Sequence, residues 1–212
     1  MKTYFITGTD TDCGKTYVTC RLVEHLQQKK KSALAIKPVA SGCLVNNDQL
    51  ENADLLKLQQ YNHANYPING WQFVSPVSPH LAAKEAGKRL SSQEIADFCC
   101  NEQFSSLDYL LVEGAGGLLV PLNEEETWLD FLKLTQIPVI VVVAMRLGCL
   151  NHALLTDSVL KTNQIHYAGW VANCLDKEML ALSDNISTLS AKMYGPLLAT
   201  LSYEGSWINN FD

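Results

Sequence analysis

Residues 8–16, Gly-Thr-Asp-Thr-Asp-Cys-Gly-Lys-Thr, hold the strongest structural signal in this chain. They follow a short apolar run at 4–6, and they lead into a pattern that places Val18, Leu22 and Leu26 on one helical face. This order predicts a strand, a glycine-framed loop and a helix, the setting in which Gly-Lys-Thr forms a phosphate site. The backbone N–H groups of such a loop, with the helix N-terminus behind them, form a concave cradle for anions.

Two side chains of this loop have a predicted chemical role. We expect the Lys15 ammonium to lie on the outer phosphates of a nucleotide and the Thr16 hydroxyl to complete the shell of a Mg²⁺ ion. Five residues separate Gly8 from Gly14, whereas the usual pattern has four. The loop is therefore a variant of the phosphate-loop architecture, or Gly8 is not the usual first glycine. The alternative is an ordinary strand–helix turn with an exposed lysine.

Length and composition favour one globular domain over residues 1–212, without a linker or an internal repeat. The net charge of −6 argues against a nucleic-acid partner, and the basic run at 29–31 is typical of a solvated helix end. No signal peptide and no apolar stretch of membrane-spanning length is visible, so we expect a cytoplasmic protein without a membrane partner.

The seven cysteines indicate neither a disulfide framework nor a zinc site, because their number is odd and paired Cys-x-x-Cys units are lacking. Most are expected to be small core residues. Cys13 is the exception, because the N–H groups of the phosphate loop and Lys15 would favour a reactive thiolate there. We expect Cys13 to be alkylated, and ATP to protect it.

Strand and helix patterns alternate along the rest of the chain. Further strands are predicted at 33–36, 107–112, 139–144, 167–172 and 197–201, and helices at 51–60, 81–86, 92–100, 127–134, 150–161 and 178–193. Residues 46–50 look like a loop, and 61–79 like a long irregular surface connection. The alternation predicts an α/β fold: a doubly wound, mostly parallel sheet with helices on both faces, in the three-layer arrangement of phosphate-loop proteins.

Ligands of such sheets bind beyond the carboxyl ends of the strands. Five polar or glycine-rich loops should meet at that edge, at 8–16, 37–42, 113–117, 146–151 and 173–174. Lys37 ends the second strand and would bring a second ammonium group to the phosphate site. Two ammonium groups near one triphosphate suggest that a second anion is also bound, or that charge develops during a reaction.

Two carboxylates are also candidates for the site at this edge of the sheet. Glu113 ends the third strand and is expected to face the metal, directly or through water. Asp54 is either a second acid of this site or a solvated side chain of its helix. With Thr16, the two carboxylates would make an oxygen shell for Mg²⁺. The segment Gly114-Ala115-Gly116 would let the backbone approach a ligand closely.

The remaining polar groups leave alternatives open. Asp10 and Asp12 must point away from phosphates, pair with a cation or face an amine substrate, unless they only stabilise the turn. The segment Gly148-Cys149-Leu150-Asn151 opens a helix, whose free N–H groups could hold a carboxylate. Asn173 could contact a base edge through its amide or cap the next turn.

Taken together, these motifs resemble the dethiobiotin synthetase family over nearly the whole chain. The five-residue spacing of the phosphate loop is also typical of that family. The matching segments are Gly8-Thr9-Asp10-Thr11, Gly14-Lys15-Thr16, Lys37-Pro38-Val39-Ala40-Ser41-Gly42, Ser78-Pro79-His80, Val112-Glu113-Gly114-Ala115-Gly116-Gly117, Leu147-Gly148-Cys149-Leu150-Asn151-His152-Ala153 and Ala168-Gly169-Trp170-Val171-Ala172-Asn173.

The resemblance implies an enzyme of biotin synthesis that converts 7,8-diaminononanoate, CO₂ and MgATP to dethiobiotin, ADP and phosphate. One amine takes up CO₂ as a carbamate, whose oxygen attacks the γ-phosphate. The second amine then closes the cyclic urea and expels phosphate. Two lysines suit this chemistry, because the carbamate and the triphosphate are both anions that must be aligned.

The resemblance also implies roles for single residues. Lys37 becomes the principal catalytic residue with Lys15 beside it, and the metal ligands become Thr16, Asp54 and Glu113. Thr11 and Ser41 contact the diamine or its carbamate, and residues 148–151 of the partner subunit of a homodimer hold the carboxylate tail. The nucleotide contacts become Asp12, Cys13, Gly14, Lys15, Thr16, Tyr17, Asp54, Glu113, Gly114, Ala115, Gly116, Asn173, Cys174, Ser202 and Tyr203.

The chain departs from the family pattern near its end. It has Asn173-Cys174 where relatives often have Asn-Asp, and the segment after Leu201 is short and lacks the usual Pro-Trp. Because this segment ordinarily covers the base, Tyr203 is expected to stack in place of tryptophan.

Two other functions fit the same scaffold. A glutamine-dependent amidase-ligase of cobyrinate type would need a glutaminase domain, for which the chain is too short. A partitioning or switch ATPase usually carries a second lysine inside the loop, where this chain has Asp10 and Asp12. A synthetase should turn over ATP only with diamine and bicarbonate.

Overall fold

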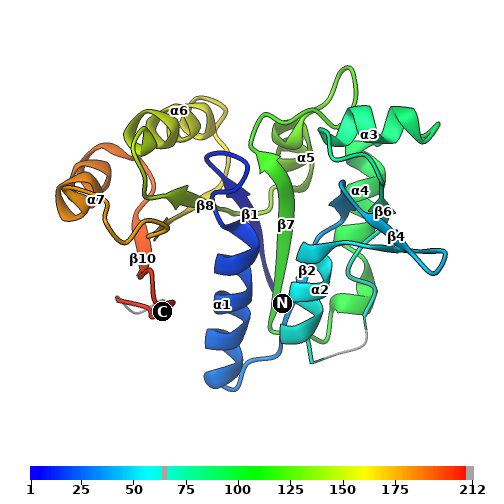
Figure 1. Ribbon diagram of the computed structural model, residues 1–212, viewed down its shortest axis with the longest axis horizontal. Coiled ribbons are helices and arrows are strands. Elements are labelled where there is room, and N and C mark those ends of the chain that lie inside the picture. Colours follow the sequence, from blue (N-terminus) through cyan, green and yellow to red (C-terminus); the bar gives the residue numbers. More distant parts are fainter. Residues whose placement is uncertain (64–65, 209–212) are drawn as a thin grey trace.

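The computed structural model describes residues 1–63 and 66–208. It is built on a six-stranded sheet, most of whose strands are labelled in Figure 1. The strand order is β10-β9-β8-β1-β7-β2, and every neighbouring pair is parallel. The strands are β1 (Lys2–Gly8), β2 (Ala33–Ile36), β7 (Tyr109–Gly117), β8 (Val139–Ala144), β9 (Tyr167–Asn173) and β10 (Leu197–Leu201). Parallel pairing gathers all six carboxyl ends at one edge, as the alternating pattern predicts.

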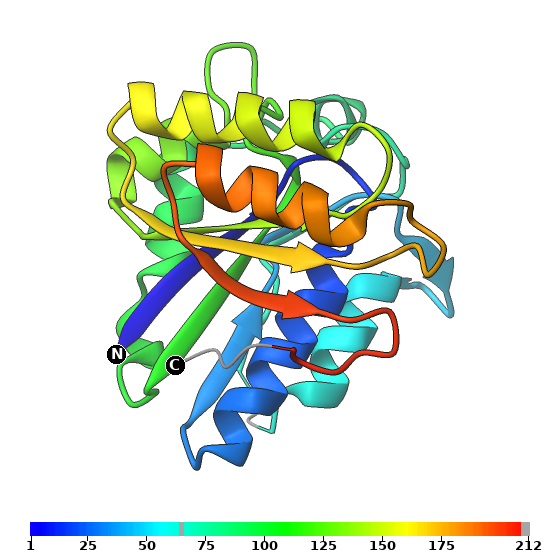
Figure 2. The ribbon, with the colours of Figure 1, turned by 90° about the vertical axis from the view of Figure 1, so that its left-hand side faces the viewer.

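Helices cover both faces of this sheet. Helices α1 (Lys15–Gln28) and α2 (Ala53–Tyr61) lie on one face, whereas α6 (Cys149–Thr162) and α7 (Leu182–Lys192) lie on the other (Figure 2). The remaining helices are α3 (Pro79–Glu85), α4 (Ser92–Cys99), the short 3₁₀ helix η1 (Glu102–Phe104) and α5 (Trp128–Thr135). The predicted doubly wound α/β fold is therefore confirmed.

The core follows from the strand pattern. Every residue of β8 is buried, as expected of a central parallel strand. In β1, the Phe5 ring lies against Trp128 and Phe131 of α5, with ring centroids 5.3 and 5.4 Å apart. Gly114 of the neighbouring β7 leaves room for this ring, because a Cβ there would lie 2.6 Å from it. The same packing holds the part of β7 that carries Glu113.

Two segments differ from the sequence-based expectation. Residues 46–50 are part of a hairpin, in which β4 (Leu44–Asn46) pairs with β5 (Gln49–Glu51). Asn47 and Asp48, both at positive φ, form the turn between these strands. Residues 61–79 are not wholly on the surface, since Ile68 and Phe73 are buried and β6 (Trp71–Gln72) pairs with β3 (Val39–Ala40). Strands of two or three residues are too short to produce a recognisable hydrophobic period.

Smaller differences concern boundaries and cysteines. Strand β7 continues to Gly117, so Glu113 lies inside the strand, and α7 begins at Leu182 rather than near residue 178. All seven cysteines are free thiols, and Cys100 is exposed. Six are buried, which agrees with the core role expected of most cysteines, but they include Cys13, for which a reactive, accessible thiol was expected. Within residues 1–63 and 66–208, no helix is long and apolar enough to cross a membrane.

Candidate active site

The phosphate loop takes its shape from two glycines. It connects the end of β1 at Gly8 with the start of α1 at Lys15. A Cβ on Gly8 would lie 2.2 Å from the Cys13 sulfur, so the loop closes tightly only over glycine. Gly14 has a φ of 84° and occupies the N-cap of α1 in the left-handed region. The free N–H groups of the first turn of α1 are therefore presented at the carboxyl edge of the sheet.

Lys15 curls back over this loop. Its Nζ donates to the carbonyl oxygen of Asp10 at 3.1 Å and lies 3.9 Å from the Cys13 sulfur. The residue is largely buried although it is a lysine, because the loop surrounds its aliphatic stem. This places an ammonium group directly above the anion cradle.

A second lysine stands at the centre of an ionic cluster. The Lys37 Nζ lies 2.5 Å from Asp54 Oδ2 and 2.9 Å from Glu113 Oε1. The Thr16 hydroxyl donates to the same Glu113 oxygen at 2.7 Å. Four side chains thus converge, from the residue after β2 and from α2, β7 and α1. The structure brings together all three predicted oxygen ligands and Lys37.

Local hydrogen bonds hold the members of this cluster in place. Asn52 caps α2, and its side-chain oxygen accepts the backbone N–H groups of Asp54 and Leu55. The Asn69 amide donates to the carbonyl oxygen of Lys37 at 2.7 Å, and the Lys37 N–H donates to the carbonyl oxygen of Ile68 at 2.8 Å. The stretch predicted as a surface connection therefore orients the strand end that carries Lys37.

Electrostatics keep Lys37 and Asp54 ionised. Burial lowers the pKa of Lys37, but the carboxylates of Glu113 and Asp54 outweigh it and raise the pKa well above the ordinary lysine value. Burial raises the pKa of Asp54, yet the Lys37 charge and hydrogen bond lower it below its usual range. At neutral pH, Lys37 is an ammonium and Asp54 is a carboxylate.

The oxygen donors of the cluster suit a Mg²⁺ ion. Thr16, Asp54 and Glu113 supply one hydroxyl and two carboxylates, and Glu113 Oε2 is buried without a partner among the described residues. In the described parts of the chain, no group of three or more His, Cys, Asp and Glu side chains could hold a metal. Mg²⁺ is usually held by one or two carboxylates together with substrate phosphates and water.

A pocket of about 400 Å³ opens over the phosphate loop and the ionic cluster. Its lining combines the loop, the start of α1 and polar groups of neighbouring segments: Thr11, Asp12, Gly14, Lys15, Thr16, Tyr17, Lys37, Ser41, Asp54, Lys57, Ala115 and Gly116. Eleven of these twelve residues are predicted site residues. Lys57 is the one lining residue that was not predicted. It lies about one helical turn after Asp54, and this spacing could have identified it from the sequence.

The structure bears on the alternatives left open for Asp10, Asp12 and Asn173. Asp10 pairs with a cation, since its Oδ2 lies 2.9 Å from Arg146 Nη2. Asp12 has a φ of 55° and lines the pocket. Asn173 does not cap its own turn: its amide donates to the carbonyl oxygen of Cys13 at 2.9 Å and braces the phosphate loop from β9.

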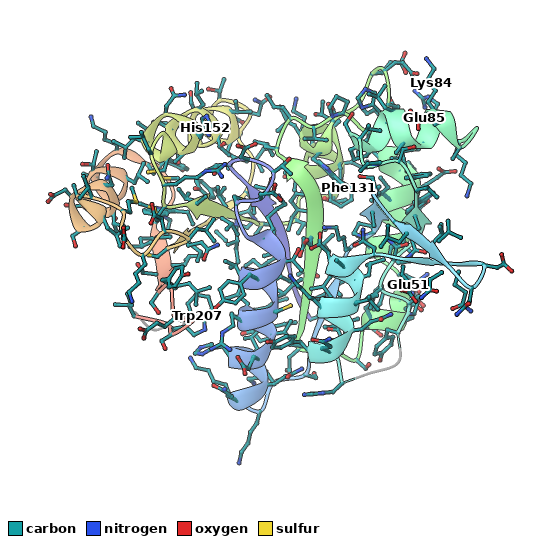
Figure 3. The ribbon with its side chains drawn as sticks, viewed as in Figure 1. Glu51, Lys84, Glu85, Phe131, His152 and Trp207 are labelled. Atoms are coloured by element: carbon teal, nitrogen blue, oxygen red, sulfur yellow. The ribbon has the colours of Figure 1, made fainter. Side chains whose placement is uncertain are left out.

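Other predicted residues lie outside the pocket lining. Residues 148–151 start α6, with Cys149 buried and His152 exposed (Figure 3). The segment after β10, which includes Ser202 and the exposed Tyr203, packs beside α1. There Arg21 donates to the carbonyl oxygen of Gly205 at 2.8 Å, and the rings of Trp207 and His25 lie 6.3 Å apart (Figure 3).

Cys13 differs most from expectation. Its thiol is fully buried beneath Gly8, and Cys174 is also buried. A reagent cannot reach the Cys13 sulfur in this conformation of the loop. This burial contradicts the prediction that Cys13 is alkylated unless ATP protects it. The Cys13 backbone is the part of the residue that remains for contact with a ligand.

Together, the parallel sheet, the glycine-framed loop and the lysine–carboxylate cluster define a phosphate-loop nucleotide-binding protein. A family described as "AAA domain" matches residues 2–210. Two solved structures share the fold. A ParA family ATPase from Chlorobium tepidum has a TM-score of 0.55 at 15% identity, covering 95% of this chain and 83% of the other. The septum site-determining protein MinD from Pyrococcus horikoshii has 0.56 at 18%, covering 95% and 81%.

Relatives in sequence are far more similar. The ATP-dependent dethiobiotin synthetase BioD of Legionella pneumophila (strain Corby) is 57% identical over 206 residues, covering 97% of this chain and 95% of the relative. The protein of the same name from Pseudoalteromonas translucida is 42% identical, covering 96% and 91%. The chain belongs to the family of ATP-dependent dethiobiotin synthetases. This confirms the predicted family and the ATP-dependent ligase class. The chain therefore belongs neither to the amidase-ligases nor to the switch ATPases that were considered as alternatives.

Proposed function

We propose that this protein uses MgATP to carboxylate 7,8-diaminononanoate and close the ureido ring of dethiobiotin, the penultimate step of biotin biosynthesis. The observation that carries this proposal is the Lys37 ammonium beside Asp54 and Glu113, in a pocket that the phosphate loop also lines. A cation at that place can neutralise an attacking carbamate and a terminal phosphate together.

The reaction proceeds in three steps. One amine of the diamine adds to CO₂ and loses a proton, which gives a carbamate. The carbamate oxygen then attacks the γ-phosphorus of ATP, which forms a carbamic–phosphoric anhydride and releases ADP. The second amine finally attacks the anhydride carbon, and the C–O bond to phosphate breaks as the cyclic urea closes.

The residues of the chain bind and align the anions. The N–H groups of residues 12–16 and the Lys15 ammonium hold the triphosphate. Lys37 holds the terminal phosphate and the carbamate in line and neutralises charge as the phosphoryl group transfers. Thr11 and Ser41, which line the pocket, contact the diamine or its carbamate.

The Mg²⁺ ion would be held by Thr16, Asp54 and Glu113. When bound, it neutralises charge on the β- and γ-phosphates of ATP. The unpartnered, buried oxygen of Glu113 supports this assignment, because a buried carboxylate oxygen otherwise requires a donor.

The nucleotide extends from the loop toward Tyr17, residues 114–116, Asn173 and Cys174, and its base toward Ser202 and Tyr203. The Asn173 side-chain oxygen is buried without a partner among the described residues, which suits an exocyclic amino group of a base. ATP as co-substrate supports a cytoplasmic enzyme.

The active protein is a homodimer with the substrate site at the subunit interface. The N-terminal segment of α6, residues 148–151, holds the carboxylate tail of the substrate bound to the partner. An apolar groove of about 390 Å³ beside the phosphate loop supports the dimer, since the exposed Leu119 and Leu155 line it.

The test is the substitution Lys37→Gln, which keeps size and polarity but removes the charge. We expect dethiobiotin formation to fall about a hundredfold or more, while ATP binding measured by calorimetry largely survives. Lys84→Gln is the matched control, because Lys84 lies on α3 and points to solvent (Figure 3). Full activity in the Lys37 variant would reject its catalytic role.

A further inference from the structure

Lys37 and the proposed Mg²⁺ ion share the same two carboxylates. Its ammonium lies 2.5 Å from Asp54 and 2.9 Å from Glu113, the residues that the proposed function assigns to the metal. The same ammonium is the group that must reach the terminal phosphate. Because the two acids hold two of its three N–H donors, the ammonium has one donor left for the reacting phosphoryl group.

The burial of these groups explains why the pairing exists. Glu113 is completely buried, and an uncompensated carboxylate in such a place is strongly destabilising. Among residues 1–63 and 66–208, no lysine or arginine other than Lys37 lies within ion-pair distance of Asp54 or Glu113. Lys37 is therefore the counter-ion of these carboxylates in the metal-free structure.

We propose that Lys37 is an exchangeable counter-ion: its ammonium neutralises Asp54 and Glu113 in the metal-free protein and leaves them when Mg²⁺ binds. This inference rests on the proposed function. In the metal-free site the one ammonium of Lys37 faces two carboxylates, which leaves a charge of −1. Two carboxylates paired with Mg²⁺ are neutralised without a lysine, and the phosphates of ATP give Lys37 a new partner. The catalytic ammonium becomes available only in the metal-loaded site.

Competition for the same carboxylates has a measurable consequence. Because binding free energies are reciprocal, a lysine that Mg²⁺ must displace weakens the binding of Mg²⁺. Removal of the Lys37 charge should therefore increase the affinity of the site for the metal ion and abolish turnover. A residue that only assists the phosphates from a distance would not produce this pair of effects.

The first experiment measures the binding of Mn²⁺ alone by electron paramagnetic resonance. We expect Lys37→Gln to bind Mn²⁺ about tenfold or more tightly than the wild type. The matched control is Lys57→Gln, which removes the same charge from the same pocket, because Lys57 forms no ion pair within the described residues. Its affinity should change by less than about threefold. Equal changes in the two variants, or weaker binding in Lys37→Gln, would overturn the exchange.

The second experiment uses the wild type, and so it does not depend on the folding of a variant. Reductive dimethylation followed by peptide mapping reports how accessible each lysine amine is. Mg²⁺ alone should speed the labelling of Lys37, which is buried in its ion pairs, and leave that of Lys84 unchanged. Unchanged or slower labelling of Lys37 with Mg²⁺ would overturn the inference. If the wild type bound no Mn²⁺, the proposed metal site itself would fail.

Discussion

Glu113 is the side chain on which the ionic cluster converges. One of its oxygens accepts from both the Thr16 hydroxyl and the Lys37 ammonium, and the other has no partner among the described residues. Glu113→Gln keeps the shape but removes the charge that a metal needs. We expect the Mg²⁺ concentration for half-maximal dethiobiotin formation to rise about tenfold or more, measured by titration of the initial rate.

The matched control for this substitution is Glu94→Gln, because Glu94 is exposed on α4. It should leave the Mg²⁺ titration unchanged. If the titration of the Glu113 variant matched that of the wild type, Glu113 would have to be removed from the metal site.

The sequence predicts single residues of this site well where a motif fixes them. Lys15 and Thr16 belong to the phosphate loop, and Lys37 and Glu113 come at or near strand ends, so the topology of a parallel sheet brings them together. The role of Asp54 was left open, because helical spacing does not show which face of the helix meets the site. Its orientation depends on the cap at Asn52. The pair between Arg146 and Asp10 spans 136 positions, and no local pattern predicts it.

Among the secondary-structure elements, α6 is tied to the end of α7 by one buried carboxylate. Asp157 of α6 accepts the N–H group of Tyr194 at 2.9 and 3.1 Å and that of Gly195 at 3.4 Å. Asp157→Ala would leave these donors without a partner and cost about 2–3 kcal/mol of unfolding free energy. Thermal unfolding followed by circular dichroism should show a decrease of about 5–10 °C.

Asp184→Ala offers a comparison for this substitution, because Asp184 is exposed in the first turn of α7. Its loss should cost less than about 1 kcal/mol. If the two variants unfolded at the same temperature, the hydrogen bonds of Asp157 would contribute little to how α6 and the end of α7 are held together.

The elements themselves could be predicted where apolar runs are long. All six strands of the central sheet and every α-helix correspond to a predicted segment, because each buries a stripe or a face of apolar side chains. The pairs β3–β6 and β4–β5 were missed. Their two- and three-residue strands depend on partners distant in the fold or on a tight turn, and β4 exposes both of its apolar side chains.

The surface of the molecule as a whole exposes an unusual group of leucines near α6. Leu147 immediately precedes this helix and is fully exposed, and Leu119 and Leu155 are more than half exposed along the groove. Burial of such side chains against a second copy removes apolar area from water. It would also bring residues 148–151 of one subunit toward the pocket of the other, as the proposed homodimer requires.

We expect light scattering to give about twice the 23.5 kDa of one chain for the wild type, and Leu155→Asp to dissociate it by placing a charge in the apolar interface. The equally apolar Leu134 lies on α5 outside the groove, so Leu134→Asp should remain dimeric. Because the residues proposed to hold MgATP all come from one subunit, the dissociated variant should bind MgATP normally and show a raised KM for the diamine. A fully active monomer would contradict the shared site.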